Sequence, residues 1–166
     1  MSIGDAVTSA SAYLTAHPDE ARYRDSPAVA RSVSGLAVTV TGPDGETVTT
    51  DMPAGIGGAA ASPSPGWLMR AAAASCVASL IAIRAAATDT VLGPFEVSVD
   101  SESDDRGILG LDDTVDAGAL SLKVVVSFEG PDPARDGVRE LVDWAVRHCP
   151  VTDTIARAVP IELELR

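Results

Sequence analysis

The sequence predicts an α+β domain in which a mainly antiparallel sheet packs on one long central helix. Alternating apolar residues, which are typical of half-buried strands, occur in two groups, at residues 33–51 and 93–130. A long apolar segment with helical spacing, residues 64–88, lies between the two groups. The expected order is helix, two strands, helix, two strands, two helices and a last strand. This order indicates the α+β class.

Composition and charge restrict the function. At 166 residues the chain is long enough for one domain with its own core. Its composition, with 46% hydrophobic and 22% charged residues, is typical of a globular protein. The net charge of −12 argues against nucleic acid, because phosphate binding needs a basic surface. It also argues against electrostatic attachment to an anionic membrane. We therefore expect neither partner.

The termini and apolar runs predict a cytoplasmic protein. The start, "MSIGDAVTSASAYLTAHPDE", lacks the basic residues and continuous apolar centre of a secretory signal. The most apolar run, "LMRAAAASCVASLIAIRAAAT", is interrupted by Arg70 and Arg84, so we expect a buried core helix and not a membrane span. In the cytoplasm, two cysteines are usually reduced thiols or a pair that cycles through a disulfide.

The N-terminal part is expected to contain a helix and a hairpin. Residues 3–16 form a short helix within an extension, residues 1–20, that precedes a single domain of residues 21–166. In residues 33–51 the turn sequence "TGPDGE" separates two alternating segments, which predicts a β-hairpin. Residues 53–66, "PAGIGGAAASPSPG", are a loop by composition, either a flexible linker or an ordered loop near a site.

The central helix is expected over residues 64–88. Pro65 stands near its first turn, where the missing N–H does no harm. Residues at spacings of three and four share one face, which we expect to be buried. They are Leu68, Ala72, Cys76, Leu80, Ile83 and Ala87.

Two strands and two helices follow. Residues 93–103 and 120–130 alternate as half-buried strands, joined by an irregular connection over 104–119. A helix is expected over 134–148, and Pro150 should end it at Cys149. Its apolar face contains Val138, Leu141, Val142, Ala145, Val146 and Cys149. A short helix over 151–159 and a strand over 160–166 complete the chain.

The two cysteines allow two interpretations. Cys76 and Cys149 both lie on apolar helix faces, where buried cysteine behaves as a small inert hydrophobe. Alternatively, Cys149 lies near the start of the next helix, where N–H groups favour the thiolate. The adjacent His148 either adds positive charge or is solvated. The histidines and cysteines show no metal-ligand spacing, so we expect neither a metal nor a cofactor.

Three segments resemble the OsmC/Ohr family. "GGAAASPSPGWLMRAAAASCVASLIAIRAAA" is similar to its glycine-rich loop and central helix, in which a cysteine follows the helix-opening proline by eleven residues, as Cys76 follows Pro65. "RHCPVTDTI" resembles the second motif, a cysteine followed by Pro-Val between helices. "DDRGILGLDDTVDAGALSLKVVV" is similar to the connector and strand between them. The resemblance covers roughly residues 30–166.

The resemblance implies an OsmC-like fold, an intertwined homodimer and a thiol peroxidase used in oxidative-stress defence. In active members, central helices pair and the sites lie at the subunit interface. Carried over, Cys76 attacks an organic hydroperoxide and becomes a sulfenic acid, which condenses with Cys149 to a disulfide. A dithiol reductant then reopens that disulfide.

One position departs from the family pattern. Active members have a glutamate after the helix-opening proline, where it holds an arginine against the thiolate, and this sequence has Gly66. Arg22, Arg24 and Arg31 are the candidates for that arginine, although a surface charge is the better explanation of each one taken alone. The departure favours an alternative, a non-catalytic OsmC-fold protein that binds a small apolar ligand at the dimer interface. A thiol–disulfide oxidoreductase without peroxide chemistry is a third possibility.

Overall fold

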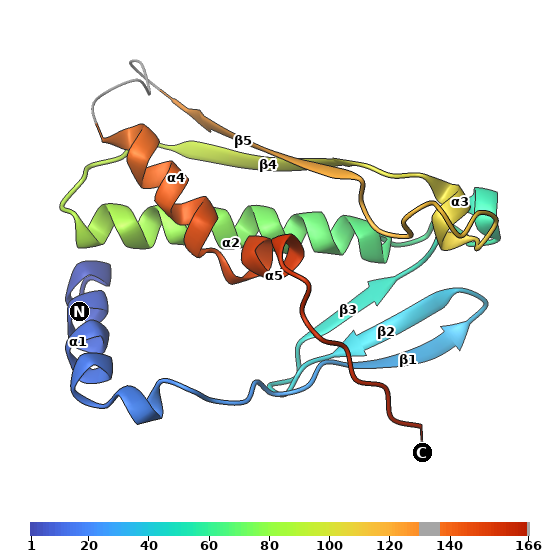
Figure 1. Cartoon of the computed structure of the whole chain (residues 1–166), viewed down its shortest axis with the longest axis horizontal. Coiled ribbons are helices and arrows are strands. Elements are labelled where there is room, and N and C mark those ends of the chain that lie inside the picture. The colour runs from blue at the N-terminus through green and yellow to red at the C-terminus, as the bar shows by residue number, and fades with distance from the viewer. Residues whose placement is uncertain (130–136, 166) are drawn as a thin grey trace. The chain divides into compact units, whose positions relative to one another are not determined.

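The computed structural model describes residues 1–129 and 137–165 (Figure 1). The chain forms two compact units, one of residues 9–69 and one that joins residues 1–8 to 70–166. Antiparallel sheets and a long helix confirm the predicted α+β class. The predicted division into an extension, residues 1–20, and a domain, residues 21–166, stays a prediction.

The unit of residues 9–69 contains a three-stranded antiparallel sheet. Its strands are β1 (Val29–Ser34), β2 (Ala37–Thr41) and β3 (Thr47–Thr50), in the order β1-β2-β3. Helix α1 (Ile3–Ala16) and a 3-10 turn, η1 (Pro18–Glu20), precede the sheet. The predicted hairpin is confirmed by β2 and β3, and the N-terminal helix by α1. Strand β1 was not predicted, because this edge strand is exposed along its whole length and has no apolar alternation.

The loop between β3 and the central helix is ordered around Asp51. Its carboxylate accepts hydrogen bonds from the N–H groups of Met52 (2.8 Å), Ala59 (3.0 Å) and Ala61 (3.2 Å). A Cβ atom on Gly58 would overlap the backbone of Met52, so only glycine allows this close approach. Of the two alternatives for residues 53–66, the structure shows an ordered loop and not a flexible linker.

Helix α2 (Pro65–Ala87) begins as predicted, but its buried face differs. Ser64 caps it, since its hydroxyl accepts the N–H of Trp67 at 3.2 Å. The buried residues are Ala73, Val77, Ile81 and Ala85. The predicted face was wrong by about one residue, which is roughly 100° around the helix. Alanine occupies several sides of α2, so apolar periodicity does not define one face, and Ala72 and Ala87 are exposed.

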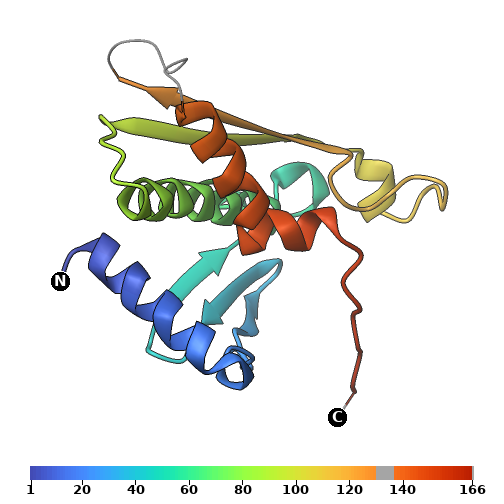
Figure 2. The same cartoon turned by 60° about the vertical axis from the view of Figure 1, so that its left-hand side comes forward.

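Helix α2 is also the one helix in the described part of the chain that is long and apolar enough to cross a membrane. Val77, Ile81 and Ala85 form a core cluster with residues of a second helix, as a core helix does. That second helix is α4 (Val138–His148), which contributes Leu141 and Ala145. Figure 2 shows α4 crossing beside α2.

The strands β4 (Phe95–Glu102) and β5 (Ser121–Phe128) form an antiparallel pair with the predicted alternation. Val97 lies opposite Val126, and both pack against the core. The connection, predicted to be irregular, contains a four-residue helix, α3 (Asp105–Ile108).

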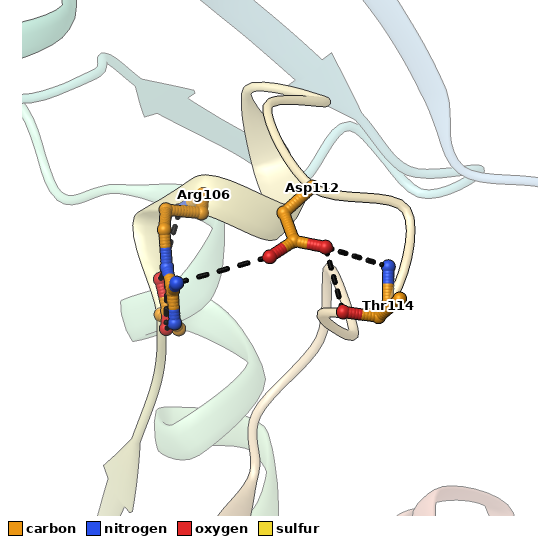
Figure 3. Close-up of polar contacts among 4 residues, drawn as sticks. Arg106, Asp112 and Thr114 are labelled. Carbon is orange, nitrogen blue, oxygen red and sulfur yellow. Dashed lines mark hydrogen bonds and ion pairs between the residues drawn. The ribbon is translucent and has the colours of Figure 1, made fainter.

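The connection between β4 and β5 is held by polar contacts (Figure 3). Arg106 pairs with Asp104, and with Asp112 at 3.8 Å. Asp112 also accepts the N–H (3.0 Å) and hydroxyl (2.6 Å) of Thr114. A Cβ on Gly107 would meet the backbone of Asp116, so this turn requires glycine.

The C-terminal helices are confirmed and the last strand is not. Helix α4 ends at Cys149 as predicted, and α5 (Pro150–Ala156) follows it. Residues 134–136 of the predicted helix, and residue 166, lie outside the described residues. Residues 160–165 form no strand. The apolar residues Ile161, Leu163 and Leu165 do alternate with polar ones, but they are 95%, 85% and 87% exposed. A strand also needs a neighbour that accepts and donates its backbone hydrogen bonds.

Candidate active site

The two cysteines meet in the core of the unit that contains residues 70–165. Cys149 is 0% exposed and belongs to the buried cluster, and the half-buried Cys76 packs against that cluster from α2. Cys149 has extended backbone angles (φ −72°, ψ 117°) because Pro150 excludes the helical conformation there. The apolar face of α4 carries its side chain inward. Both thiols are free.

The Cys76 thiol is disfavoured as an anion. Burial raises its pKa, and a hydrogen bond with Cys149 raises it further. A hydrogen bond from the N–H of Val151 acts in the opposite direction but does not offset them. Burial and the neighbouring Cys149 thus both favour the neutral thiol of Cys76.

The Cys149 thiol has the opposite tendency. Burial alone would raise its pKa, but hydrogen bonds from Cys76, Thr152 and Val151 outweigh burial and lower it. The Thr152 hydroxyl has only one proton, and the carbonyl of Val146 lies 2.6 Å away. That hydroxyl proton goes to the carbonyl, so the lowered pKa of Cys149 is due to Cys76 and to the backbone N–H groups of Thr152 and Val151.

Aromatic and basic side chains of α2 and α4 stack on one another. The ring of His148 lies on that of Trp144, with centroids 4.3 Å apart, and the guanidinium of Arg84 lies 4.7 Å from the Trp144 centroid. Nδ1 of His148 lies 2.8 Å from the Trp144 carbonyl, so it carries the proton that it donates there. His148 is exposed, which agrees with the solvated alternative.

The predicted arginines lie in the other unit. Arg22 and Arg24 belong to the segment between η1 and β1, and Arg31 is on β1. All three are exposed. The assignment of one of them to Cys76 stays a prediction.

Gly66 lies exposed in the first turn of α2, and that turn contains no acidic residue. The missing carboxylate that the sequence indicated is therefore not replaced by a neighbour within this turn.

Sequence reasoning missed the groups that surround Cys149. Val151 and Thr152 act through N–H groups at the start of α5, which no side-chain motif reveals. The available signal was the spacing of "CPVT", because a residue before a helix-opening proline faces the free N–H groups of the first turn.

Comparisons with known proteins agree with this arrangement. The family model described as OsmC-like protein matches residues 57–164. The organic hydroperoxide resistance protein OhrB of Bacillus subtilis is 24% identical, with 86% of this chain and 98% of that chain covered and a TM-score of 0.55.

Two further solved structures are similar. One is an organic hydroperoxide resistance protein OsmC from Legionella pneumophila (21% identity, 80% and 91% covered, TM-score 0.61). The other is an OsmC-like protein from Mycoplasma pneumoniae (14% identity, 81% and 89% covered, TM-score 0.67). No curated protein matches the chain. The family match covers most of the chain and includes both cysteines, and the protein belongs to the OsmC-like family.

Proposed function

We propose that the protein is a thiol-dependent peroxidase that reduces organic hydroperoxides in oxidative-stress defence. The observation that carries this proposal is the packing of Cys76 against the buried cluster that contains Cys149, because a disulfide requires two thiols within reach. Two of the similar proteins are named as organic hydroperoxide resistance proteins, which supports the same substrate class.

The different exposure of the two sulfurs supports their proposed roles. Cys76 is partly exposed and Cys149 is 0% exposed, so a hydroperoxide reaches Cys76 first. The Cys76 sulfur attacks the terminal oxygen, the O–O bond breaks, and an alcohol leaves. The sulfenic acid on Cys76 then reacts with Cys149, water leaves, and a disulfide forms. A dithiol reductant returns both thiols, which is the chemistry expected in a reducing cytoplasm.

A peroxide-consumption assay with a dithiol tests this function. The wild type should consume cumene hydroperoxide, and Cys76→Ser should not. Cys149→Ser should react once and accumulate sulfenic or over-oxidised Cys76, whereas the wild type should show an intramolecular disulfide by mass spectrometry. A Cys76 that stays reduced under excess hydroperoxide would exclude the peroxidase.

A second candidate is a non-catalytic protein that binds a small apolar ligand. The raised pKa of Cys76, caused by burial, and the first turn of α2 without a carboxylate favour it. The same assay separates the candidates, because this one predicts no hydroperoxide consumption. A thiol–disulfide oxidoreductase would instead exchange with disulfide substrates while leaving hydroperoxide untouched.

We also propose that the protein is a homodimer. Three apolar side chains at alternate positions, Ile161, Leu163 and Leu165, are at least 85% exposed, and a second copy is the natural cover for them. Light scattering should give twice the chain mass. A stable monomer at micromolar concentration would contradict the dimer and the interfacial placement of the site.

A further inference from the structure

Helices α4 and α5 meet at a corner where one helical carbonyl lacks its usual partner (Figure 1). In an α-helix each C=O accepts the N–H of the residue four positions later. For Val146 that residue is Pro150, which has no N–H. Val146 is half-buried, and an unpaired carbonyl away from water is costly. The end of α4 therefore needs a donor from elsewhere.

The side chain of Thr152 supplies that donor. Its hydroxyl oxygen lies 2.6 Å from the carbonyl oxygen of Val146, which is a short O–H···O hydrogen bond. The same hydroxyl oxygen lies 3.1 Å from the carbonyl oxygen of Cys149. The hydroxyl thus reaches a carbonyl in the last turn of α4 and another at the joint, and its single proton goes to the nearer one. This one side chain spans the corner.

The corner sets the direction of the Cys149 side chain. The backbone of Cys149 is extended (φ −72°, ψ 117°), and its carbonyl accepts the N–H of Asp153 at 2.9 Å as α5 begins. Its side chain is 0% exposed and belongs to the cluster against which Cys76 packs. A disulfide has narrow limits, since its two Cβ atoms lie about 3.5–4.5 Å apart. A small opening of the corner would therefore take Cys149 out of reach.

We propose that Thr152 is a positioning residue for disulfide formation: its hydroxyl replaces the N–H that Pro150 lacks and holds Cys149 where it can react with Cys76. This role rests on the proposed peroxidase function and concerns only its second step. In that step the Cys149 sulfur attacks the sulfenic sulfur of Cys76, the S–O bond breaks, and hydroxide leaves with the Cys149 proton as water. Thr152 exchanges no atom with either cysteine.

Substitutions at Thr152 separate the effect of the hydroxyl from that of the side-chain shape. Thr152→Val keeps nearly the same shape and removes the donor, whereas Thr152→Ser keeps the donor. Thr154 provides a matched control, because its exposed hydroxyl donates to the Pro150 carbonyl at 2.7 Å, within α5. Thr154→Val thus removes a hydroxyl from the same helix without removing a bond to α4 or to Cys149.

Single-turnover kinetics measure the two steps separately. Reduced protein without dithiol is mixed with cumene hydroperoxide, and mass spectrometry of quenched samples follows the sulfenic acid on Cys76 and its conversion to the disulfide. In Thr152→Val the rate constant of the second step should fall, relative to the first, at least about fivefold, the factor that one ordinary hydrogen bond is worth in an equilibrium. Over-oxidised Cys76 should accumulate.

The comparison variants decide what this loss means. Thr152→Ser should recover most of the second rate constant, and Thr154→Val should retain that of the wild type. A second step in Thr152→Val that is as fast as in the wild type would overturn the proposed role of Thr152. An equal loss in Thr154→Val would overturn it too.

The equilibrium between protein and dithiothreitol tests the position of Cys149 without hydroperoxide. The fraction of disulfide at a series of reduced-to-oxidised dithiothreitol ratios gives the equilibrium constant of the Cys76–Cys149 bond. In Thr152→Val this constant should fall by a similar factor, and in Thr154→Val it should not. A lower melting temperature with an unchanged constant would show that Thr152 is merely structural. A wild type that forms this disulfide while Cys76 ignores hydroperoxide would overturn the proposed function alone.

A third measurement uses the wild type and does not depend on the folding of a variant. The Thr152 hydroxyl proton should exchange slowly with water and give a resolved NMR signal in both the reduced and the disulfide form. Its loss on oxidation would overturn the proposed role, because the hydroxyl would then hold a corner that the disulfide has to break.

Discussion

Replacing Gly66 by glutamate tests both the helix and the thiol chemistry. Gly66 lies exposed in the first turn of α2, after the Ser64 cap, and this turn contains no acidic residue. A carboxylate at this place interacts favourably with the unpaired N–H groups of the helix start. Gly66→Glu should therefore stabilise the protein whether or not it changes activity.

The magnitude follows from two separable effects. Removing a glycine from a helix gains at most about 1 kcal/mol, which Gly66→Ala measures, and less is expected in a first turn. The charge at the helix start adds about 0.3–1 kcal/mol at low salt. Gly66→Gln has a similar side chain without charge, so the difference between Gly66→Glu and Gly66→Gln isolates the electrostatic part. Gly66→Lys places a positive charge at the helix start, so its electrostatic contribution to the free energy of unfolding should have the opposite sign to that of Gly66→Glu.

Urea unfolding at low and high salt measures these differences, since urea does not itself screen charge. The Glu–Gln difference should shrink when salt is added. If Gly66→Glu is no more stable than Gly66→Gln at low salt, the reasoning about the helix start is wrong.

The same variants report on the thiol. If an arginine is near Cys76, the new carboxylate should hold it there. The arginine should then lower the Cys76 pKa and raise the rate of reaction with peroxide. Each pKa unit is worth roughly 1.4 kcal/mol of thiolate stabilisation. Gly66→Gln should not produce this gain. An unchanged slow rate in Gly66→Glu would mean that no such arginine is present.

Three other changes test the fold. Ile81→Ala removes a side chain from the buried cluster and should lower the free energy of unfolding by about 2–5 kcal/mol. Ile161 is 95% exposed in the single chain, so Ile161→Ala should lower the free energy of unfolding of the monomer far less. Equal effects of the two substitutions would contradict the described core. Hydrogen bonds from backbone N–H groups, that of Ala61 first, hold the pKa of Asp51 below its usual value. This stabilisation is complete above the ordinary aspartate pKa and is lost as the pH falls through the lowered pKa of Asp51. Asp51→Asn should therefore be less stable than wild type at neutral pH, and the difference in their free energies of urea unfolding should shrink in acid. A difference that stays constant with pH would contradict this account. Deleting residues 160–166 should shift light scattering from dimer to monomer; an unchanged dimer would show that this segment does not hold the subunits together.

The sequence predicted the strands of the β4–β5 pair well because their alternation has no competing explanation. Phe95, Val97 and Val99 face inward, and Glu96 and Asp100 are exposed, as the pattern requires. The prediction of the buried face of α2 failed for the opposite reason. With alanine at nine of the 23 positions, several faces are similarly apolar, and packing against α4 decides which one is buried.

Two strand errors have the same physical origin. Strand β1 is defined by its hydrogen bonds to β2 and not by apolar side chains, so its sequence gives little indication of a strand. Residues 160–165 have the alternation but form no strand in the single chain. Strand formation depends on a neighbour, and that information is not contained in the segment itself.

The candidate site was predicted only in part. Motif spacing indicated Cys76 and Cys149, and Cys76 packs against the buried cluster that contains Cys149. The different acidities of the two thiols follow from burial and from backbone N–H groups, which depend on where α5 begins. Those are properties of the folded arrangement and not of the residue types.

The position of Cys149 between two helices links oxidation to the lifetime of the folded chain. A disulfide from the middle of α2 to this joint would close a loop of about 70 residues, which in the chain-entropy account destabilises the unfolded state by about 4 kcal/mol. An oxidant would thus leave the protein more resistant to heat and to proteases, and the dithiol that restores its reactivity would remove that protection. The supply of reductant would then set the turnover of the reaction and also the survival of the protein between encounters with hydroperoxide.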